Sequence, residues 1–204
     1  MNLYDEKIDK VSAKKQLKEK QLFDSAYELF LTQGIEKTSI SDIVNKAGIA
    51  KGTFYLYFND KHDLLNKLIL KKSNKLLKEA MNETTNEKID DFSERVLFFI
   101  DYIIENLKHN KLLLKIINKN ISWGLYRKNI LKPEEYYNVN KVVDSFIKNL
   151  VNSGMSKEEA EMTLFMIIEL VGSVCFTTII FKEPTDIDTI KPILFKKILA
   201  MIKV

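Results

Sequence analysis

Cysteine is almost absent from the sequence, because Cys175 is the only one. A single thiol excludes a disulfide within one chain and any metal site built on several cysteines. Histidine is nearly as scarce, since only His62 and His109 occur, and neither belongs to a cluster with metal-ligand spacing. The sequence also has no glycine-rich phosphate loop, no nucleophile elbow and no paired-carboxylate site. We therefore expect neither an enzyme nor a protein that holds a metal or a cofactor.

Proline and glycine are rare as well, with 3 and 6 residues spread widely along 204 positions. A chain so poor in helix breakers and so rich in Leu, Ile, Lys and Glu is expected to be mostly helical. Hydrophobic residues make up 46% and charged residues 29%, which is typical of a folded globular protein rather than a disordered one. The composition therefore predicts an all-α fold with a real core.

The N-terminus is polar and has no apolar signal region, so we expect a cytoplasmic protein. The segment Met162–Phe181 tests this view, because it is almost wholly apolar and about long enough to span a bilayer. It contains Glu169 near its middle, followed by hydroxyl side chains. We interpret the segment as a buried helix of a bundle, and we expect no membrane partner.

The positive charge is carried almost entirely by lysine, since Arg95 and Arg127 are the only arginines, and the net charge is only +4. A local cluster is more informative than this balance. Its lysines are Lys10, Lys14, Lys15, Lys18 and Lys20. Two interpretations stay open for such a run, namely a solvated helix face and a patch that faces phosphates.

Helical periodicity and capping residues divide the N-terminal part into four helices. Apolar residues at helical spacing predict a first helix from about Val11 to Gln33, with Gly34 as its stop. Ser39 and Asp42 form a capping box for a short second helix that ends at Gly48. We expect a third helix over about 51–57, and a fourth that Asp60 caps and that continues to about 82.

The C-terminal part is expected to contain five further helices, with breaks near 84–86, 123–133, 154 and 183–188. Ser156 and Glu159 form another capping box, which makes the start of the fourth of these helices the clearest boundary. The expected ranges are 88–109, 111–121, 133–153, 156–181 and 189–203.

Residues 38–58 have the pattern of a helix, a tight turn and a second helix. Gly48 supplies the backbone freedom that the turn needs. A small core can form from Ile40, Ile43, Val44, Ala47, Ile49, Phe54 and Phe58. The second of the two helices then presents Lys51, Gly52, Thr53, Tyr55, Leu56 and Tyr57. A cation, a hydroxyl, phenols and a glycine are suitable groups for a DNA groove, and a second helix laid in the major groove is the helix-turn-helix mode of reading DNA.

The segment Leu22–Leu65 closely resembles the DNA-binding region of the TetR/AcrR family of transcriptional regulators. Many positions agree in register over about a fifth of the chain. The matching residues are Ala26, Leu29, Phe30, Gly34, Thr38, Ser39, Asp42, Ile43, Ala47, Gly48, Lys51, Gly52, Thr53, Tyr55, Phe58, Lys61, Leu64 and Leu65. Ala50 departs from the family, which often has a capping Ser at this position.

The resemblance implies roles for individual residues. The corner formed by Thr38 and Ser39, at a helix N-terminus, is similar to a phosphate contact of the family. Tyr55 and Lys61 are similar to its phosphate clamps, although Tyr55 alone is also compatible with packing between helices and Lys61 with a merely exposed lysine. The positions that correspond to the family's contacts with base edges are Lys51, Thr53, Leu56 and Tyr57.

By the same resemblance, residues 1–60 are the helix-turn-helix DNA-binding domain and residues 61–204 a helical domain for ligand binding and dimerisation. The helix expected over 156–181 is apolar on nearly all sides, so it must be covered on all sides. Pairing of this helix and the last helix with their copies satisfies that need, and a buried helix of a monomer is the alternative. The residues expected at the dimer interface are Gly172, Ser173, Ile193 and Ile198.

Aromatic and apolar residues of the C-terminal domain are candidates to line a ligand cavity, with plain core packing as the alternative for each. Glu169 is a carboxylate among apolar neighbours and needs a partner, for which a ligand's polar group, a lysine and hydroxyls of the dimer mate are the alternatives. In the first case it is the candidate for the polar anchor of the ligand. The proposed lining residues are Phe98, Tyr102, Trp123, Tyr126, Met166, Glu169 and Phe176.

Together these features predict a homodimer that binds double-stranded operator DNA. The resemblance implies control by a small ligand, and we expect a repressor that this effector releases from a palindromic operator. The aromatic residues of the C-terminal domain indicate that the effector is largely apolar. Two alternatives keep the DNA-binding fold but change its use. They are a DNA-binding activator and a helical adaptor without a small-molecule effector.

Overall fold

The structure is a computed structural model that describes residues 3–120 and 137–203. Every element in this part of the chain is a helix, which confirms the predicted all-α fold. The proposed cavity residues Trp123 and Tyr126 lie outside the described residues, as does the break expected over 123–133.

The chain divides into two compact units, Met1–Leu70 and Lys71–Val204. The N-terminal unit contains α1 (Leu3–Gln33), α2 (Ile40–Ala47) and α3 (Lys51–Phe54), and α4 (Lys61–Asn86) begins in it. The change of unit falls inside α4 rather than at residue 60, because the first turns of α4 pack into the core of the N-terminal unit. Leu64, Leu65 and Leu68 of α4 are all buried.

Three helices of the N-terminal unit differ in length from the sequence prediction. Helix α1 begins at Leu3, about two turns before the predicted start at Val11. Helix α3 is shorter than expected and ends at Phe54, because residues 55–57 form a turn. Helix α4 continues to Asn86, so the predicted break at 84–86 is wrong. Inside this helix the Thr84 hydroxyl donates to the carbonyl of Ala80 at 2.7 Å.

The ends of α2 agree with the prediction. The Ser39 hydroxyl accepts from the Asp42 amide at 3.1 Å, and the Asp42 carboxylate accepts from the Ser39 amide at 2.8 Å. This reciprocal pair is a capping box, which satisfies two amide groups that the helix itself leaves unpaired. Gly48 ends the helix in the left-handed region with φ of 66°, a conformation that favours glycine.

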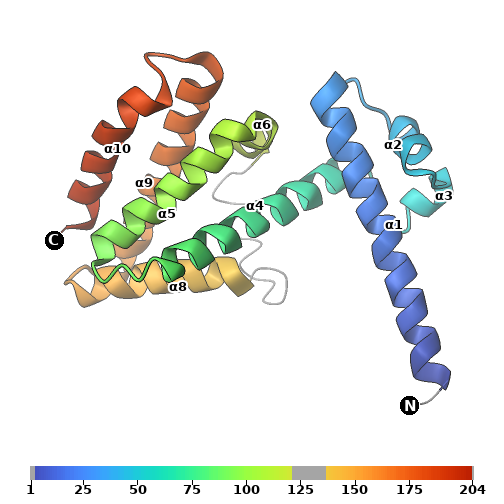
Figure 1. Ribbon diagram of the computed structural model, residues 1–204, viewed down its shortest axis with the longest axis horizontal. Helices are drawn as coiled ribbons and strands as arrows, with labels where there is room; N and C mark the ends of the chain where they lie inside the picture. The colour runs from blue at the N-terminus through green and yellow to red at the C-terminus, as the bar shows by residue number, and fades with distance from the viewer. Residues whose placement is uncertain (1–2, 121–136, 204) are drawn as a thin grey trace. The chain divides into compact units, whose positions relative to one another are not determined.

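An aromatic cluster forms the centre of the N-terminal unit. The rings of Phe23 and Phe58 meet edge to face with centroids 5.1 Å apart, and the rings of Phe54 and Phe58 are 5.5 Å apart. Phe54 and Phe58 are 0% and 1% exposed. Figure 1 shows α2 and α3 beside the C-terminal half of α1, the half that contains the buried residues Leu22 and Phe23. The cluster therefore joins α1 to the segment that carries α3.

The C-terminal unit consists of helices around a continuous apolar core. Among the residues that the structure describes, its elements after α4 are α5 (Phe92–His109), α6 (Lys111–Asn120), α8 (Tyr137–Asn152), α9 (Lys157–Phe176), η1 (Thr177–Phe181) and α10 (Ile187–Ile202). Side chains of α5, α9 and α10 meet in the core, where Ile104, Cys175 and Ile198 are fully buried. Figure 1 shows α9 and α10 next to each other in this unit.

Capping residues fix the helix starts in the C-terminal unit. The Ser156 hydroxyl accepts from the Glu159 amide at 3.1 Å, and α9 begins directly after this cap, as predicted. Helix α5 starts at Phe92, four residues later than expected, because Asp91 is its cap. The helix expected over 156–181 changes its hydrogen-bond pattern at residue 177, where the wider turn η1 follows α9.

Ion pairs join α5 to α10 at the surface of the C-terminal unit. The Lys191 ammonium lies 2.7 Å from Asp101 and 2.8 Å from Glu105, and the Lys108 ammonium lies 2.7 Å from Asp188. Lys191 and Lys108 lower the pKa of Glu105 below its ordinary value, with the bond to Lys191 as the main cause. The contribution of Glu105 to stability is therefore present above that ordinary pKa and is lost as the pH falls through the lowered value.

We predict that Phe54→Ala lowers the free energy of unfolding by about 3–5 kcal/mol, because it removes a fully buried ring from the aromatic cluster. Urea denaturation followed by circular dichroism measures this change. Leu56→Ala is the matched control two residues further along, since Leu56 is 77% exposed. The control is expected to change the free energy of unfolding by no more than about 0.5 kcal/mol. Equal losses in both variants would contradict the assignment of Phe54 to the core.

Candidate nucleic-acid interface

Helix α3 and the turn after it have one buried side and one open side. Phe54 and Phe58 point into the aromatic cluster, whereas Tyr55 and Leu56 are 53% and 77% exposed. Thr53 is half-buried at the edge between the two sides. The structure therefore separates the residues that hold the segment from those that are available to a partner, as the sequence pattern predicted.

Backbone hydrogen bonds position the start of α3, which has no side-chain cap. The Ile49 amide donates to the Val44 carbonyl at 2.9 Å across the glycine turn, and the Thr53 amide donates to the Ala50 carbonyl at 2.8 Å. Ala50 has no side chain that could cap the helix start. The start of α3 is therefore not covered by a capping side chain, and the exposed Lys51 follows directly.

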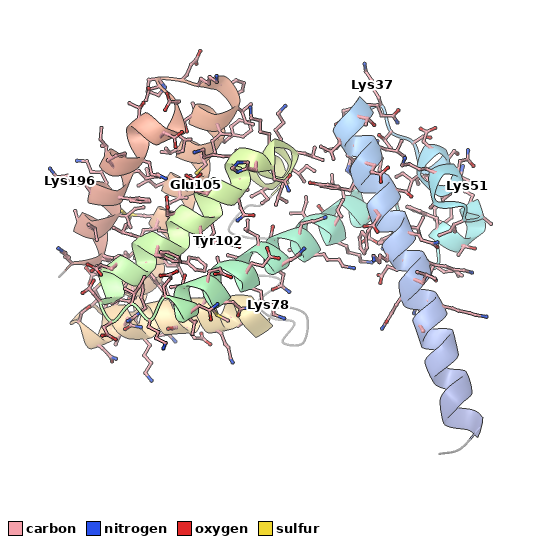
Figure 2. The ribbon with its side chains drawn as sticks, in the orientation of Figure 1. Lys37, Lys51, Lys78, Tyr102, Glu105 and Lys196 are labelled. Carbon is pink, nitrogen blue, oxygen red and sulfur yellow. The ribbon has the colours of Figure 1, made fainter. Side chains whose placement is uncertain are left out.

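Lys51 and Gly52 form the open start of α3. Both are exposed, and Figure 2 shows the Lys51 side chain on the side of the helix-turn-helix that faces away from α1. A Cβ atom added to Gly52 would meet nothing within 4 Å in the protein. The glycine is therefore not needed for packing inside the unit, which is compatible with the close approach of an external partner.

The corner before α2 differs from the expectation for Thr38. This residue is only 1% exposed, and its hydroxyl donates to the Gly34 carbonyl at 2.7 Å. The Thr38 side chain therefore stabilises the turn between α1 and α2 and is not available to a phosphate. Ser39 is exposed, but its hydroxyl donates to the Asp42 carboxylate at 2.7 Å. The Asp42 carboxylate accepts hydrogen bonds from the Ser39 hydroxyl and the Ser39 amide, and these bonds lower the pKa of the Asp42 carboxyl group below its ordinary value.

Tyr55, Tyr57 and Lys61 surround the exposed turn in different ways. Tyr55 is mostly exposed and only touches the edge of the Phe54 ring, so packing between helices does not account for it. Tyr57 is half-buried. The ammonium of Lys61 donates to the Ile35 carbonyl at 2.9 Å and to the Thr38 carbonyl at 3.0 Å. Lys61 is thus bound inside the unit, a feature that the family resemblance did not indicate.

The lysine cluster of α1 lies on a part of the helix that the rest of the unit leaves open. The cluster members whose side chains the structure describes, Lys14, Lys15, Lys18 and Lys20, are all exposed. Exposure is compatible with both interpretations of the cluster, the solvated face and the phosphate-facing patch. The two therefore stay open.

Two proposed cavity residues do not line a cavity in the C-terminal unit. Met166 is 48% exposed, and Glu169 is exposed beside it on the outer side of α9. The Glu169 carboxylate is therefore exposed in the protomer and is not the polar anchor of an enclosed cavity. Phe98, Tyr102 and Phe176 are half-buried, and Figure 2 shows Tyr102 on α5. Of these three, Tyr102 and Phe176 pack against the core.

The expected interface residues separate into two groups. Ile193 is 59% exposed on α10, and Ser173 is exposed on α9 with the half-buried Gly172 before it. Ile198 is 0% exposed and belongs to the core of the protomer, so its prediction as an interface residue was wrong. It points inward because α10 turns Leu194, Ile198 and Ile202 toward the other helices of its unit.

Sequence reasoning missed further exposed apolar residues on α9. Met162, Phe165 and Ile168 are 61%, 37% and 37% exposed. At spacings of three and four, Met162 and Phe165 lie with Met166 on one largely apolar outer face, which also contains Glu169. The repeat of these positions at spacings of three and four was a usable signal, but the inner side of α9 is equally apolar. The segment Lys157–Phe181 is long and apolar enough to cross a membrane by length and composition alone. A third of its most apolar stretch is buried inside the protein.

Two buried polar atoms were also missed. The Ser73 hydroxyl on α4 and the Asn140 side-chain oxygen on α8 are buried, and neither has a hydrogen-bond partner among the described residues. Buried polar atoms of this kind ordinarily have a partner. In the same part of the chain, no three His, Cys, Asp or Glu side chains gather where they could hold a metal ion.

The comparisons with known proteins agree with this geometry. Residues 22–68 match the family model described as bacterial regulatory proteins, tetR family. The chain is 50% identical over 48 residues to the HTH-type transcriptional regulator YvdT of Bacillus subtilis. It is 38% identical over 68 residues to the fatty acid metabolism regulator protein of the same organism. These matches cover 24% and 33% of this chain, and only 25% and 34% of the respective relatives.

The similarity of fold extends over nearly the whole chain. The crystal structure of the transcriptional regulator FadR from Bacillus subtilis, in complex with stearoyl-CoA, superposes with a TM-score of 0.66. The superposition covers 89% of this chain and 97% of FadR, at 18% sequence identity, so it shows a shared fold. The family match covers the helix-turn-helix and the start of α4, and the remaining helices share the fold of FadR. Residues 22–68 therefore resemble the DNA-binding region of the tetR family of bacterial regulatory proteins, within a chain that has the fold of the regulator FadR.

Proposed function

We propose that the protein is a dimeric repressor that binds a palindromic operator through α2 and α3 and is released by a small, largely apolar effector. The observation that carries the DNA-binding part is the division of α3 into a buried and an open side. Phe54 and Phe58 hold the segment, which leaves Lys51, Thr53 and Leu56 for the major groove. A regulator of this kind acts in the cytoplasm and needs no catalytic site.

The open side of the segment offers two kinds of contact. The Tyr55 hydroxyl is suited to a phosphate oxygen, which positions the protein on any duplex. Leu56 has no polar group, so a thymine methyl group is its natural contact, whereas the Thr53 hydroxyl can bond to a base edge. The glycine at position 52 lets the helix start come close to the DNA backbone.

We predict that Leu56→Ala and Thr53→Val change which base is preferred at single operator positions, because direct readout contributes about 1–3 kcal/mol per base contact. Tyr55→Phe is instead expected to weaken binding to all duplexes alike, by about 1 kcal/mol for one hydrogen bond. Selection of bound duplexes from a random pool, followed by affinity measurements on the selected sites, separates these effects. A changed base preference in Tyr55→Phe would contradict the assignment.

The dimer is supported by the outer apolar face of α9. Met162, Phe165 and Met166 expose apolar surface that a monomer would leave in water, and Ile193 of the neighbouring α10 is 59% exposed. Pairing of α9 and α10 with their copies covers this face. A C2 dimer presents two recognition helices to successive major grooves about 34–36 Å apart, which matches a palindromic site.

We predict that Gly172→Asp yields monomers and abolishes specific operator binding, because it places a charge in the proposed interface. A Cβ atom at this position meets nothing within 4 Å inside the protomer, so the substitution does not disturb the core. Val151→Asp on α8 is the matched control, since Val151 is also apolar and is 40% exposed. Sedimentation equilibrium measures both. A Gly172→Asp protein that remains dimeric would contradict the assignment of the interface to α9 and α10.

The effector site is proposed in the C-terminal unit. Tyr102 and Phe176 pack against the apolar core, and the buried atoms of Ser73 and Asn140 replace Glu169 as candidates for a polar anchor. The effector that these candidates call for is an apolar chain with one hydrogen-bonding group. FadR, with which this chain shares its fold, binds stearoyl-CoA, so we propose a long-chain acyl compound as the effector class. Helix α4 begins in the N-terminal unit and carries Ser73, so its displacement would connect ligand binding to DNA binding.

We predict that stearoyl-CoA lowers operator affinity by a coupling of about 1–3 kcal/mol, and that operator DNA lowers the affinity for stearoyl-CoA by the same factor. Isothermal titration of stearoyl-CoA into the protein alone and into the protein–operator complex measures both sides. Coenzyme A without the acyl chain is the control and is expected to bind weakly. Equal affinity for stearoyl-CoA in both states would refute the mechanism, however tight the binding.

A further inference from the structure

Lys61, the first residue of α4, is bound to the turn that joins α1 to α2. Its ammonium donates to the Ile35 carbonyl at 2.9 Å and to the Thr38 carbonyl at 3.0 Å, over 26 and 23 residues of sequence. The lysine is half-buried, and the hydroxyl of Thr38 in the same turn is engaged with Gly34. Two of the three donors of the ammonium are therefore used inside the protein.

The position of Lys61 is electrostatically unfavourable unless something compensates for it. A cation at a helix N-terminus meets the positive end of the helix dipole. The two carbonyl oxygens supply the missing negative partial charge, because they follow the C-terminus of α1 and face the ammonium directly. Charge-assisted hydrogen bonds of this kind are stronger than neutral ones. The two bonds from Lys61 therefore stabilise one conformation of the turn between α1 and α2.

A second lysine of α4 binds the other end of the helix-turn-helix. The Lys67 ammonium donates to the Tyr57 carbonyl at 3.1 Å and lies 5.2 Å from the centre of the Phe58 ring. It also pairs with the Asp63 carboxylate at 3.2 Å, and that carboxylate accepts from the Asn59 amide at 2.8 Å. The first two turns of α4 therefore hold the chain just before α2 and just after α3.

We propose that Lys61 and Lys67 are positioning residues, which fix the helix-turn-helix on α4 and thereby set the orientation of the recognition segment. This role deepens the proposed DNA-binding function and rests on it. It differs from a phosphate clamp in a measurable way. A clamp loses a DNA phosphate contact when the lysine is removed, whereas a positioning residue loses the geometry of the reading surface and keeps the phosphate contacts.

The test compares Lys61→Met with the wild-type protein in two measurements. The first is the salt dependence of binding to the selected operator, for which each lost phosphate contact reduces the slope of log K against log salt by about 0.9. We expect an unchanged slope with operator affinity lowered about tenfold, the size of effect that a lost charge-assisted bond produces. The second is amide hydrogen exchange of the DNA-free protein, which we expect to become about tenfold faster over residues 35–42.

Three further variants make the result specific. Lys37→Met removes an exposed charge from the same turn, as Figure 2 shows, and is expected to leave the exchange of that turn unchanged. Lys61→Arg keeps donors that reach both carbonyls and is expected to restore slow exchange. Lys67→Met serves where Lys61→Met fails to fold, because Lys67 is more exposed, and is expected to speed exchange over residues 55–59.

The outcomes separate the two roles of Lys61. Faster exchange of the turn with an unchanged salt slope supports the proposal. A slope reduced by about 0.9 with unchanged exchange would overturn it and establish a phosphate clamp. Unchanged affinity and unchanged exchange would also overturn it. A wild-type protein that binds no duplex would refute the proposed function instead, and hydrogen exchange of the DNA-free variants would then decide the positioning role alone.

Discussion

The N-terminal unit depends on the burial of Phe54 and Phe58, because the helix that carries its open surface cannot hold itself in place. Helix α3 has only four residues and no side-chain cap. Isolated helices are marginal in water even at three times this length. Its position is therefore set by tertiary packing, in which both rings are almost completely buried next to Phe23. Tyr55 and Leu56 are exposed because the side of this segment that carries Phe54 and Phe58 faces the core, which leaves the opposite side open.

Features governed by local interactions could be predicted from the sequence. The capping box of Ser39 and Asp42 and the left-handed turn at Gly48 depend on residues within three or four positions of each other, and the structure contains both. The inward direction of Phe54 and Phe58 followed from helical periodicity. Contacts over long sequence distances were not accessible in this way. The bonds from Lys61 to the turn before α2 join residues that are more than twenty positions apart, and no local sequence pattern predicts them.

The C-terminal unit shows the limit of periodicity for a helix that is apolar on every side. Helix α9 turns Ala160 and Ile167 inward and Met166 and Glu169 outward, yet both sides have the same general composition. Hydrophobicity alone therefore could not assign Glu169 to the outer side of the protomer, because only the neighbouring helices decide which side is covered. Ile198 illustrates the converse case, because an apolar residue of a terminal helix fits an interface and a core equally well until the packing is known.

The environment of the only cysteine constrains the kind of signal to which the protein can respond. Cys175 is fully buried in α9, and burial raises the pKa of its thiol to about 12. The nucleophilic thiolate is therefore essentially unpopulated at neutral pH, and oxidants have no access to the sulfur. Peroxide, nitric oxide and electrophile sensing through this side chain are accordingly disfavoured.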